Sequence, residues 1–257
     1  MQNNTFSTLF VGQNLIKLLA VDSTNSFMKT MVSNSEPLPE GTVIMAENQY
    51  QGRGQVEGRW HAEPGKNLTF SILLRPSFLL PADQFKLNMA VSIGIQTALG
   101  TVIGSGLSVK WPNDIYFEDK KLGGILIENI ISGSKIKASV IGIGINVNQE
   151  IFENDLVARA GSICQILQKN VDLIPLLAQI CSHIEVAYLK LRAGNYLTLR
   201  KEYLDYLYRL NVSANYRQNG EIIKGKIIDV SDRGLLSIET EKGVMQYNFK
   251  EIEFVQS

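Results

Sequence analysis

Cysteine and histidine are scarce in this sequence of 257 residues, which contains two of each. Cys164 and Cys181 have no spacing with a histidine that suits a metal ion, and two cysteines are too few for a disulfide framework. The sequence therefore indicates no metal ligands, and it predicts core thiols in a reducing cytoplasm. His61 and His183 belong to no pattern that indicates catalysis.

The chain also lacks net charge and long apolar runs. Lys plus Arg and Asp plus Glu both number 25, so a whole-protein basic field for nucleic acid is absent. No basic N-terminal stretch leads into an apolar segment, and no apolar run has the length of a membrane span. We expect a soluble cytoplasmic protein without nucleic-acid or membrane partners.

The spacing of apolar residues predicts an α+β domain followed by a small β domain. Strands are expected within residues 1–20 and at 42–47, 67–74, 108–111, 125–131 and 135–147, and helices at 26–32, 83–99, 173–191 and 196–206. Beyond residue 210, short strands alternate with the turn-forming pairs Asn219-Gly220, Arg233-Gly234 and Lys242-Gly243. We expect domains at 1–209 and 210–257, with the smaller one packed on the larger because it is too short for a core of its own.

The loop Gly52-Arg53-Gly54-Gln55-Val56-Glu57-Gly58-Arg59-Trp60 is the most informative stretch of the chain. Glycines let the backbone approach a ligand, arginines hold phosphate or carboxylate, and the indole offers a face to a base. This combination suits a nucleotide or an acyl-adenylate. The loop is neither a Walker loop nor a dinucleotide fingerprint, and a solvated, flexible loop is the alternative if it is taken alone.

Three further segments contain residues that could contact a ligand. In Lys110-Trp111-Pro112-Asn113-Asp114, the proline ends a strand and leaves Lys110 at its terminus, where an ammonium could stabilise an α-phosphate. A strand-ending turn with a surface lysine is the alternative. Paired glycines at 123–124 and alternating glycines at 142 and 144 permit close approach of a flat ligand, with a hairpin turn and a tightly packed strand as the alternatives.

Taken in order, these segments resemble the catalytic core of the biotin protein ligases, and the similarity runs from about Leu18 to the end. The matching pieces are Ser23-Thr24-Asn25, Gln49 with the 52–60 loop, Pro64-Gly65-Lys66-Asn67-Leu68, Lys110-Trp111-Pro112-Asn113-Asp114, Lys121-Leu122-Gly123-Gly124-Ile125 and Gly142-Ile143-Gly144-Ile145-Asn146. The resemblance implies a mixed β-sheet flanked by helices, as in class II synthetases, followed by a small SH3-like β-barrel.

The resemblance also implies an ATP-dependent ligase. Such an enzyme makes biotinyl-5′-AMP from biotin and ATP with Mg²⁺, and then transfers biotin to a lysine of a biotin carboxyl carrier domain. The chain starts almost directly at the catalytic core, which leaves no room for the N-terminal DNA-binding domain of some relatives. We therefore expect a short form that does not bind DNA. A homodimer is possible.

The family's site residues carry over position by position. The biotin contacts are expected at Ser23, Thr24, Asn25, Gln49, Gly52, Arg53, Gly54, Gln55, Lys110, Gly123, Gly124, Gly142 and Gly144. The ATP contacts are expected at Arg53, Arg59, Trp60, Lys110 and Asn146, and the catalytic residues at Lys110 and Arg53. Many members carry arginine where this chain has Gln55, so we expect easier escape of the adenylate. Glu57 is expected either to pair with Arg53 or Arg59 or to reduce the local positive potential.

Two other functions stay open from the sequence. A lipoate or octanoyl transferase is built on a similar core, but it would not be expected to combine the Gly-Arg-Gly loop with the C-terminal β domain. A non-catalytic sensor of biotin or its adenylate is the second alternative. The presence of both Arg53 and Lys110 argues against a sensor, because a sensor needs no stabilisation of an α-phosphate.

Overall fold

The structure is a computed structural model that describes residues 6–33, 38–55, 58–152 and 159–255. Its larger sheet has the strand order β1-β2-β3-β7-β6-β5-β4. The strands are β1 (Leu15–Val21), β2 (Val43–Gln49), β3 (Leu68–Leu74), β4 (Leu107–Lys110), β5 (Asp114–Phe117), β6 (Lys120–Ser132) and β7 (Lys135–Ile145). Strands β1 and β2 are parallel and the other pairs are antiparallel, so the sheet is mixed.

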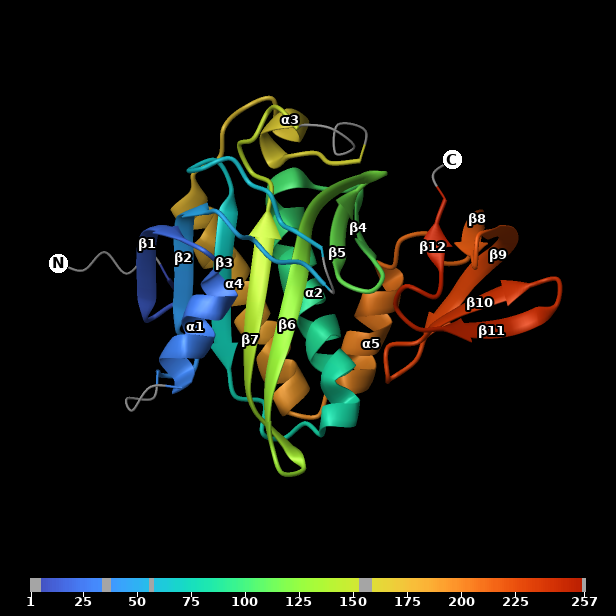
Figure 1. Cartoon of the computed structure of the whole chain (residues 1–257), viewed down its shortest axis with the longest axis horizontal. Coiled ribbons are helices and arrows are strands. Elements are labelled where there is room, and N and C mark those ends of the chain that lie inside the picture. Colours follow the sequence, from blue (N-terminus) through green and yellow to red (C-terminus); the bar gives the residue numbers. More distant parts are fainter. Residues whose placement is uncertain (1–5, 34–37, 56–57, 153–158, 256–257) are drawn as a thin grey trace.

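Helices cover both faces of this sheet (Figure 1). The short helix α1 (Thr24–Ser33) lies on one face, over β3 and β7. The long helices α2 (Gln84–Ile103) and α4 (Leu173–Arg192) lie on the other face with α5 (Tyr196–Asp205). A 3₁₀ turn (Pro81–Asp83) and α3 (Ile163–Leu167) complete the described helices. None of the described helices has the length and hydropathy needed to cross a membrane.

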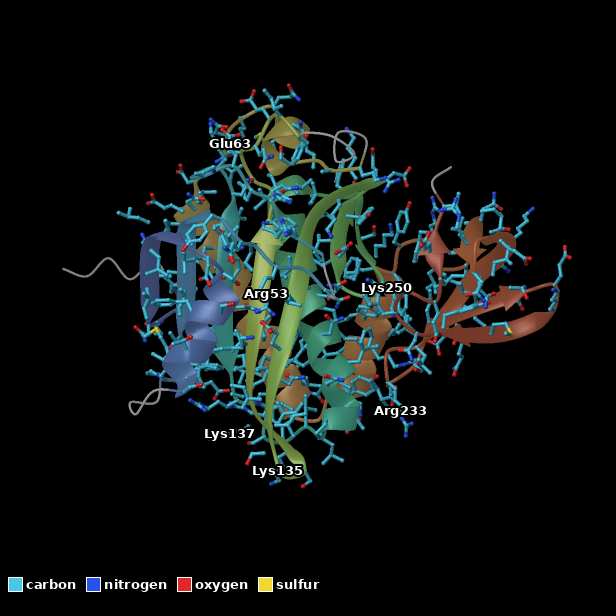
Figure 2. All side chains as sticks on the ribbon, viewed as in Figure 1. Arg53, Glu63, Lys135, Lys137, Arg233 and Lys250 are labelled. Atoms are coloured by element: carbon cyan, nitrogen blue, oxygen red, sulfur yellow. The ribbon has the colours of Figure 1, made fainter. Side chains whose placement is uncertain are left out.

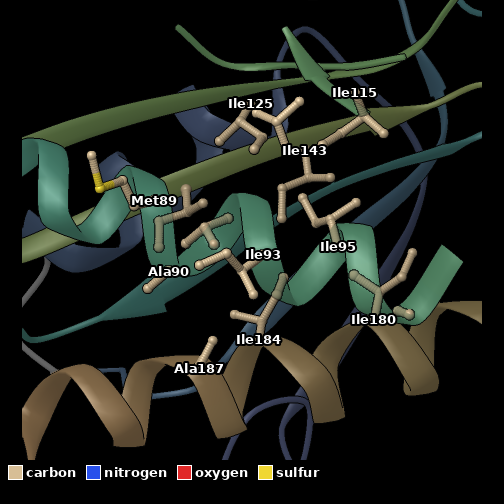
Figure 3. Packing of buried hydrophobic residues seen from close by; sticks show 14 of the residues in the cluster. Met89, Ala90, Ile93, Ile95, Ile115, Ile125, Ile143, Ile180, Ile184 and Ala187 are labelled. Carbon is tan, nitrogen blue, oxygen red and sulfur yellow. The ribbon is translucent and has the colours of Figure 1, made fainter. Parts of the chain in front are cut away.

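The main core fills the space between the sheet and the two long helices. Figure 3 shows Ile125 and Ile143 of the sheet pointing toward α2, and Ile184 of α4 packing on the opposite side of α2. Helix α2 is therefore buried nearly all around, which explains why apolar residues occupy more than one stripe of it. A smaller core under α1 contains Met28 and Ile44.

A second sheet follows at the C-terminus, with the strand order β11-β10-β9-β8-β12. Its strands are β8 (Ser213–Gln218), β9 (Glu221–Val230), β10 (Leu236–Thr240), β11 (Gly243–Tyr247) and β12 (Glu253–Phe254). Asn219 and Gly220 both have positive φ, as a two-residue hairpin turn between β8 and β9 requires. The buried residues of this sheet are continuous with the main core. The domain boundary at residue 209 stays a prediction.

The α+β fold expected from the sequence is confirmed, with three local differences. Residues 112–121 were expected only to connect two strands, but they contain β5, which has four residues and therefore too short a pattern to predict. The glycine pair at 123–124 lies inside β6 rather than in a turn, and the turn occurs at Glu118 and Asp119 instead. Helix α3 was also not predicted. It begins with a capping box between Ser162 and Gln165.

Close contact between α2 and α4 depends on one glycine. A β-carbon at Gly94 would lie 2.6 Å from the Cα atom of Ile184, so the two backbones approach each other closely there. Gly94→Ala should therefore force the helices apart and lower the free energy of unfolding by about 1–3 kcal/mol. Gly100 lies in the same helix, and a β-carbon there would have nothing within 4 Å, which makes Gly100→Ala the matched control.

Gly100→Ala should stabilise the protein by up to about 1 kcal/mol, because alanine has the higher helix propensity. Urea unfolding followed by circular dichroism would measure both changes. Equal effects of the two substitutions would contradict the importance of the close helix contact.

Candidate functional site

A cavity of about 330 Å³ opens on the α1 side of the larger sheet. Its walls come from the start of α1, the loop after β2, the adjoining ends of β4 and β5, the first half of β6, the C-terminal part of β7, and the C-terminal domain. The loop after β2 crosses in front of β3, β7 and β6 (Figure 1), and several of its residues line the cavity. Segments that lie far apart in the sequence thus meet at one place.

Glycines on β7 form the floor of the cavity. A β-carbon at Gly142 would lie 2.6 Å from Oδ1 of Asn25, and one at Gly144 would lie 2.3 Å from Cε2 of Trp60. Asn25 and Trp60 can therefore lie directly on the strand only because both positions lack a side chain. Gly124 of β6 also lines the cavity.

One end of the cavity carries a network of polar side chains with fixed positions. The Oε1 atom of Gln49 accepts hydrogen bonds from the backbone N–H (2.9 Å) and the hydroxyl (3.1 Å) of Thr24. Ser71 donates to Oδ1 of Asn25 (2.6 Å), while Nδ2 of Asn25 donates to Glu128 (2.9 Å). Ser23, Thr24 and Asn25 are all buried. The network presents oriented amides and hydroxyls to a polar ligand group.

Glu128 forms ion pairs with two cations at this end of the cavity. Its carboxylate accepts from Arg53 (2.6 Å), from Lys29 (2.7 Å) and from Asn25. Burial alone would raise the pKa of Glu128, but the hydrogen bonds from Lys29, Asn25 and Arg53 outweigh it, and the pKa lies below its ordinary value. Arg53, in front of β6 and β7 in Figure 2, also donates to Ser26 (3.2 Å). No role for Glu128 was predicted, because its partners come from distant segments.

Lys110 lies at the other end of the cavity, at the end of β4. Its Nζ donates to the hydroxyl of Tyr116 (3.0 Å) and lies 4.6 Å from the ring centre of Tyr116 and 4.9 Å from that of Phe254. Burial in this aromatic surrounding lowers the pKa of Lys110 to about 8. An amine with this pKa can exist in both protonation states near neutral pH.

A second lysine was not predicted as a site residue. Lys121 lines the same cavity and forms an ion pair with Asp114 (2.6 Å). The register of the sheet sets this contact, because Asp114 of β5 pairs with Gly124 of β6 and faces Lys121 on that strand. The signal was available, since Lys121 begins the glycine segment that the resemblance already identified.

The C-terminal domain supplies one wall of the cavity through Phe249 and Ile252, which lie between β11 and β12, and through Phe254 of β12. Phe249 packs edge-on against Trp111 with ring centres 6.4 Å apart, and Nε1 of Trp111 donates to the carbonyl of Gly234 (2.9 Å). Nothing in the local sequence around these aromatic residues indicates a site. Their role depends on how the two sheets pack together.

The structure brings most of the predicted site residues together. The cavity is lined by Ser23, Thr24, Asn25, Gln49, Arg53, Gly54, Gln55, Arg59, Trp60, Lys110, Gly124, Gly142 and Gly144. Gly52 instead lines a wider groove of about 1190 Å³ on the outer side of the same loop. Gly123 and Asn146 are absent from the lining. Glu57 lies outside the described residues.

Asn146 and Gly123 face other parts of the protein. The buried side chain of Asn146 donates to the carbonyl of Gly161 (3.0 Å), and a β-carbon at Gly123 would meet Ile145 and the Gly144 carbonyl on the neighbouring strand. The functional roles of all these residues stay predictions. Among the described residues, no group of three or more His, Cys, Asp or Glu side chains could hold a metal ion.

Comparison with known proteins agrees with this geometry. Residues 19–146 match the biotin/lipoate A/B protein ligase family. The chain is 28% identical over 248 residues to the bifunctional ligase/repressor BirA of Bacillus subtilis, covering 96% of this chain and 75% of that protein. A biotin–[acetyl-CoA-carboxylase] ligase of Paracoccus denitrificans is 33% identical over 133 residues, which is 51% of this chain and 53% of that protein.

Solved structures give the same result over nearly the whole chain. A biotin protein ligase from Aquifex aeolicus, in complex with biotin and ATP, superposes with a TM-score of 0.80 at 28% identity. The match covers 95% of this chain and all of that one. The chain therefore belongs to the biotin protein ligases of the biotin/lipoate A/B family.

The Glu128 cluster should restrain the loop that carries Arg53. Glu128→Gln removes the negative charge that Arg53 and Lys29 share, so trypsin should cleave after Arg53 several-fold faster than in the unchanged protein. Limited proteolysis followed by mass spectrometry would measure the rate. Glu63→Gln is the matched control, because Glu63 lies exposed near the same loop (Figure 2). Identical cleavage rates in both variants would show that the cluster does not hold the loop.

Proposed function

We propose that the chain joins biotin to a carrier protein in two steps. It forms biotinyl-5′-AMP and pyrophosphate from biotin and ATP, and then transfers the biotinyl group to a lysine of a biotin carboxyl carrier domain. One observation carries the proposal. A single cavity joins a network suited to a ureido ring, a floor of glycines and the cations Lys110 and Lys121.

The polar network at the first end suits the ureido ring of biotin. A ureido group has two N–H donors and a carbonyl acceptor, and the network offers both amide and hydroxyl partners close to a flat floor at Gly142 and Gly144. These groups are already hydrogen-bonded to one another, so they lose little conformational freedom on binding. Ser23, Thr24, Asn25 and Gln49 are the proposed contacts.

In the first step, a carboxylate oxygen of biotin attacks the α-phosphorus of ATP, and the bond to the bridging oxygen of pyrophosphate breaks. Negative charge accumulates around the α-phosphate during this displacement. Lys110, Lys121 and Arg53 lie around the cavity and stabilise that charge, with Arg53 leaving its ion pair to Glu128. Magnesium arrives as part of the nucleotide substrate, since protein sites usually hold it through one or two carboxylates together with phosphate oxygens.

The adenine contacts require the loop to move. Trp60 lies on Gly144, and its indole nitrogen is buried without a hydrogen-bond partner in the described chain. We propose that Trp60 and Arg59 rearrange around the adenylate when the loop closes, with Asn146 as a further nucleotide contact. Binding energy from the substrates would drive this change.

The Paracoccus relative is named for acetyl-CoA carboxylase, which supports a biotin carboxyl carrier domain as the partner. A cytoplasmic location fits the two buried, unpaired cysteines. Formation of a homodimer and absence of nucleic-acid binding stay predictions.

The first test is biotin-dependent release of pyrophosphate from MgATP. The unchanged protein should release pyrophosphate with biotin, and Lys110→Ala should be slower by about 100-fold, because one charge-stabilising donor is lost. Lipoate and octanoate serve as matched acids. Pyrophosphate release with lipoate but not with biotin would show that biotin is the wrong substrate. Binding of biotin without any pyrophosphate release would indicate a sensor rather than an enzyme.

Gln55 offers a test of how the adenylate is retained. Gln55 lines the cavity, and its Oε1 atom is buried without a partner among the described residues. A cation at this position would attract the adenylate phosphate, so Gln55→Arg should slow adenylate dissociation by about tenfold, equivalent to about 1.4 kcal/mol. Stopped-flow displacement by excess biotin would measure it. An unchanged dissociation rate would mean that Gln55 does not control escape.

A further inference from the structure

The two lysines of the cavity have different surroundings. Lys121 forms an ion pair with the carboxylate of Asp114. Lys110 has no ion pair among the described residues. It lies instead against two aromatic rings, one from β5 and one from β12, and its Nζ donates to the hydroxyl of Tyr116.

The charges that face Lys110 act mostly in one direction. Burial is the largest influence and lowers its pKa, Asp114 raises it, and the cations Lys121, Arg209 and Arg159 lower it further. The result, a pKa of about 8, makes a substantial fraction of Lys110 neutral in mildly alkaline solution.

Tyr116 can accommodate either form of Lys110. Burial, together with the nearby Asp114, raises the pKa of the Tyr116 hydroxyl above its ordinary value, so this group stays protonated. A neutral hydroxyl accepts a hydrogen bond from an ammonium and donates one to an amine. The contact of 3.0 Å therefore survives a change in the protonation of Lys110. A carboxylate in the same place would hold the lysine in its charged form.

The second step of the proposed reaction needs a proton acceptor. The carrier lysine arrives mainly as an ammonium, since an ordinary lysine titrates near a pH of about 10. Only its neutral form has the lone pair that attacks the acyl carbon. The arrangement around Lys110 provides an amine that can take this proton inside the same cavity.

We propose that Lys110 serves both half-reactions in opposite protonation states, as an ammonium during adenylation and as the neutral amine that accepts a proton from the carrier lysine during transfer. The inference rests on the proposed ligase function and deepens it. Replacement of ATP by the adenylate drives this change in the protonation of Lys110. The triphosphate carries several negative charges that favour the ammonium, whereas the adenylate keeps only one after pyrophosphate has left. Lys110 then releases its proton to water.

Protons and electron pairs balance in the transfer step. The ammonium of the carrier lysine gives one proton to the amine of Lys110, and the neutral nitrogen attacks the acyl carbon of biotinyl-adenylate. The bond between that carbon and the phosphate oxygen breaks, and AMP leaves with the electron pair. The second proton of the new amide nitrogen passes to water. Lys110 ends as the ammonium that the next adenylation requires.

Lys110→Arg separates the two roles, because arginine keeps the positive charge but does not lose a proton in proteins. Pre-formed biotinyl-adenylate is mixed with enzyme and a purified biotin carboxyl carrier domain in single-turnover experiments between about pH 6 and about pH 10. For the unchanged protein, transfer should rise with pH and level off above about 8, the pKa of Lys110. Lys110→Arg should be at least about 100-fold slower at neutral pH and should continue to rise toward a pH of about 10.

Hydroxylamine supplies the matched control nucleophile. It is uncharged at neutral pH and needs no base. In Lys110→Arg, hydroxylamine should therefore convert enzyme-bound biotinyl-adenylate to biotinyl hydroxamate at nearly the rate of the unchanged protein. Transfer by Lys110→Arg with the unchanged rate and pH profile would overturn the inference. Slow reaction with hydroxylamine as well would also overturn it, because the loss would then lie in adenylate binding. Absence of biotin-dependent pyrophosphate release in the unchanged protein would instead refute the ligase function.

Phe254→Ala tests the same idea through the pKa. Removing this ring admits water to the Nζ of Lys110, so the midpoint of the transfer profile should move toward higher pH. Ile222→Ala, an exposed position on β9 of the same sheet, is the control and should leave the profile unchanged. An unmoved midpoint in Phe254→Ala would contradict titration of Lys110 in the transfer step.

Discussion

The absence of side chains at Gly142 and Gly144 is the constraint on which the rest of the site depends. These residues lie near the C-terminal end of β7, a central strand that pairs with β3 on one side and β6 on the other. Because the strand is bare there, Asn25 from α1 and Trp60 from the loop can reach the sheet itself. Glycines normally weaken the packing of a central strand, but Ile141, Ile143 and Ile145, which alternate with them, are buried in the main core. Packing of β7 on the core therefore does not depend on side chains at 142 and 144.

Charge in the site is organised locally although the whole chain is neutral. Glu128 holds Arg53 and Lys29 at one end, Asp114 holds Lys121 near the middle, and aromatic rings surround Lys110 at the other end. Two of the three arrangements are ion pairs, whereas burial among aromatic rings lowers the pKa of Lys110. Net charge therefore says little about such a site, because function depends on which partner each cation has.

Regular periodicity made much of the fold predictable. The amphipathic pattern of residues 173–191 and the apolar runs at 67–74 and 135–147 correspond to α4, β3 and β7. The short β5 could not be predicted in the same way, since four residues carry no usable period. Its place is set by pairing with β4 and β6, which is a property of the folded sheet.

Part of the candidate site was likewise predictable from the sequence and part was not. Segments with unusual composition, such as the Gly-Arg-Gly loop and the Lys-Trp-Pro-Asn-Asp segment, were recognised from the sequence and line the cavity. Glu128, Phe249 and Phe254 were missed because ordinary residue types acquire a role only through contacts across the fold. Asn146 stands in a recognisable segment, and its side chain donates to the Gly161 carbonyl. Its role as a nucleotide contact stays a prediction.

The wall that the C-terminal sheet contributes links two properties that are usually treated separately. Phe249, Ile252 and Phe254 line the cavity and belong to the C-terminal domain, whose sheet contacts the larger domain through Trp111 and through the pair Arg200–Asp229. A ligand that contacts this wall binds only while the sheet is docked, so ligand affinity includes the free energy of docking. Occupancy of the cavity and hydrogen exchange in β8–β12 consequently both depend on the docking equilibrium of the smaller sheet. The hydrogen-exchange rate of the smaller sheet therefore depends on the fraction of cavities that hold a ligand.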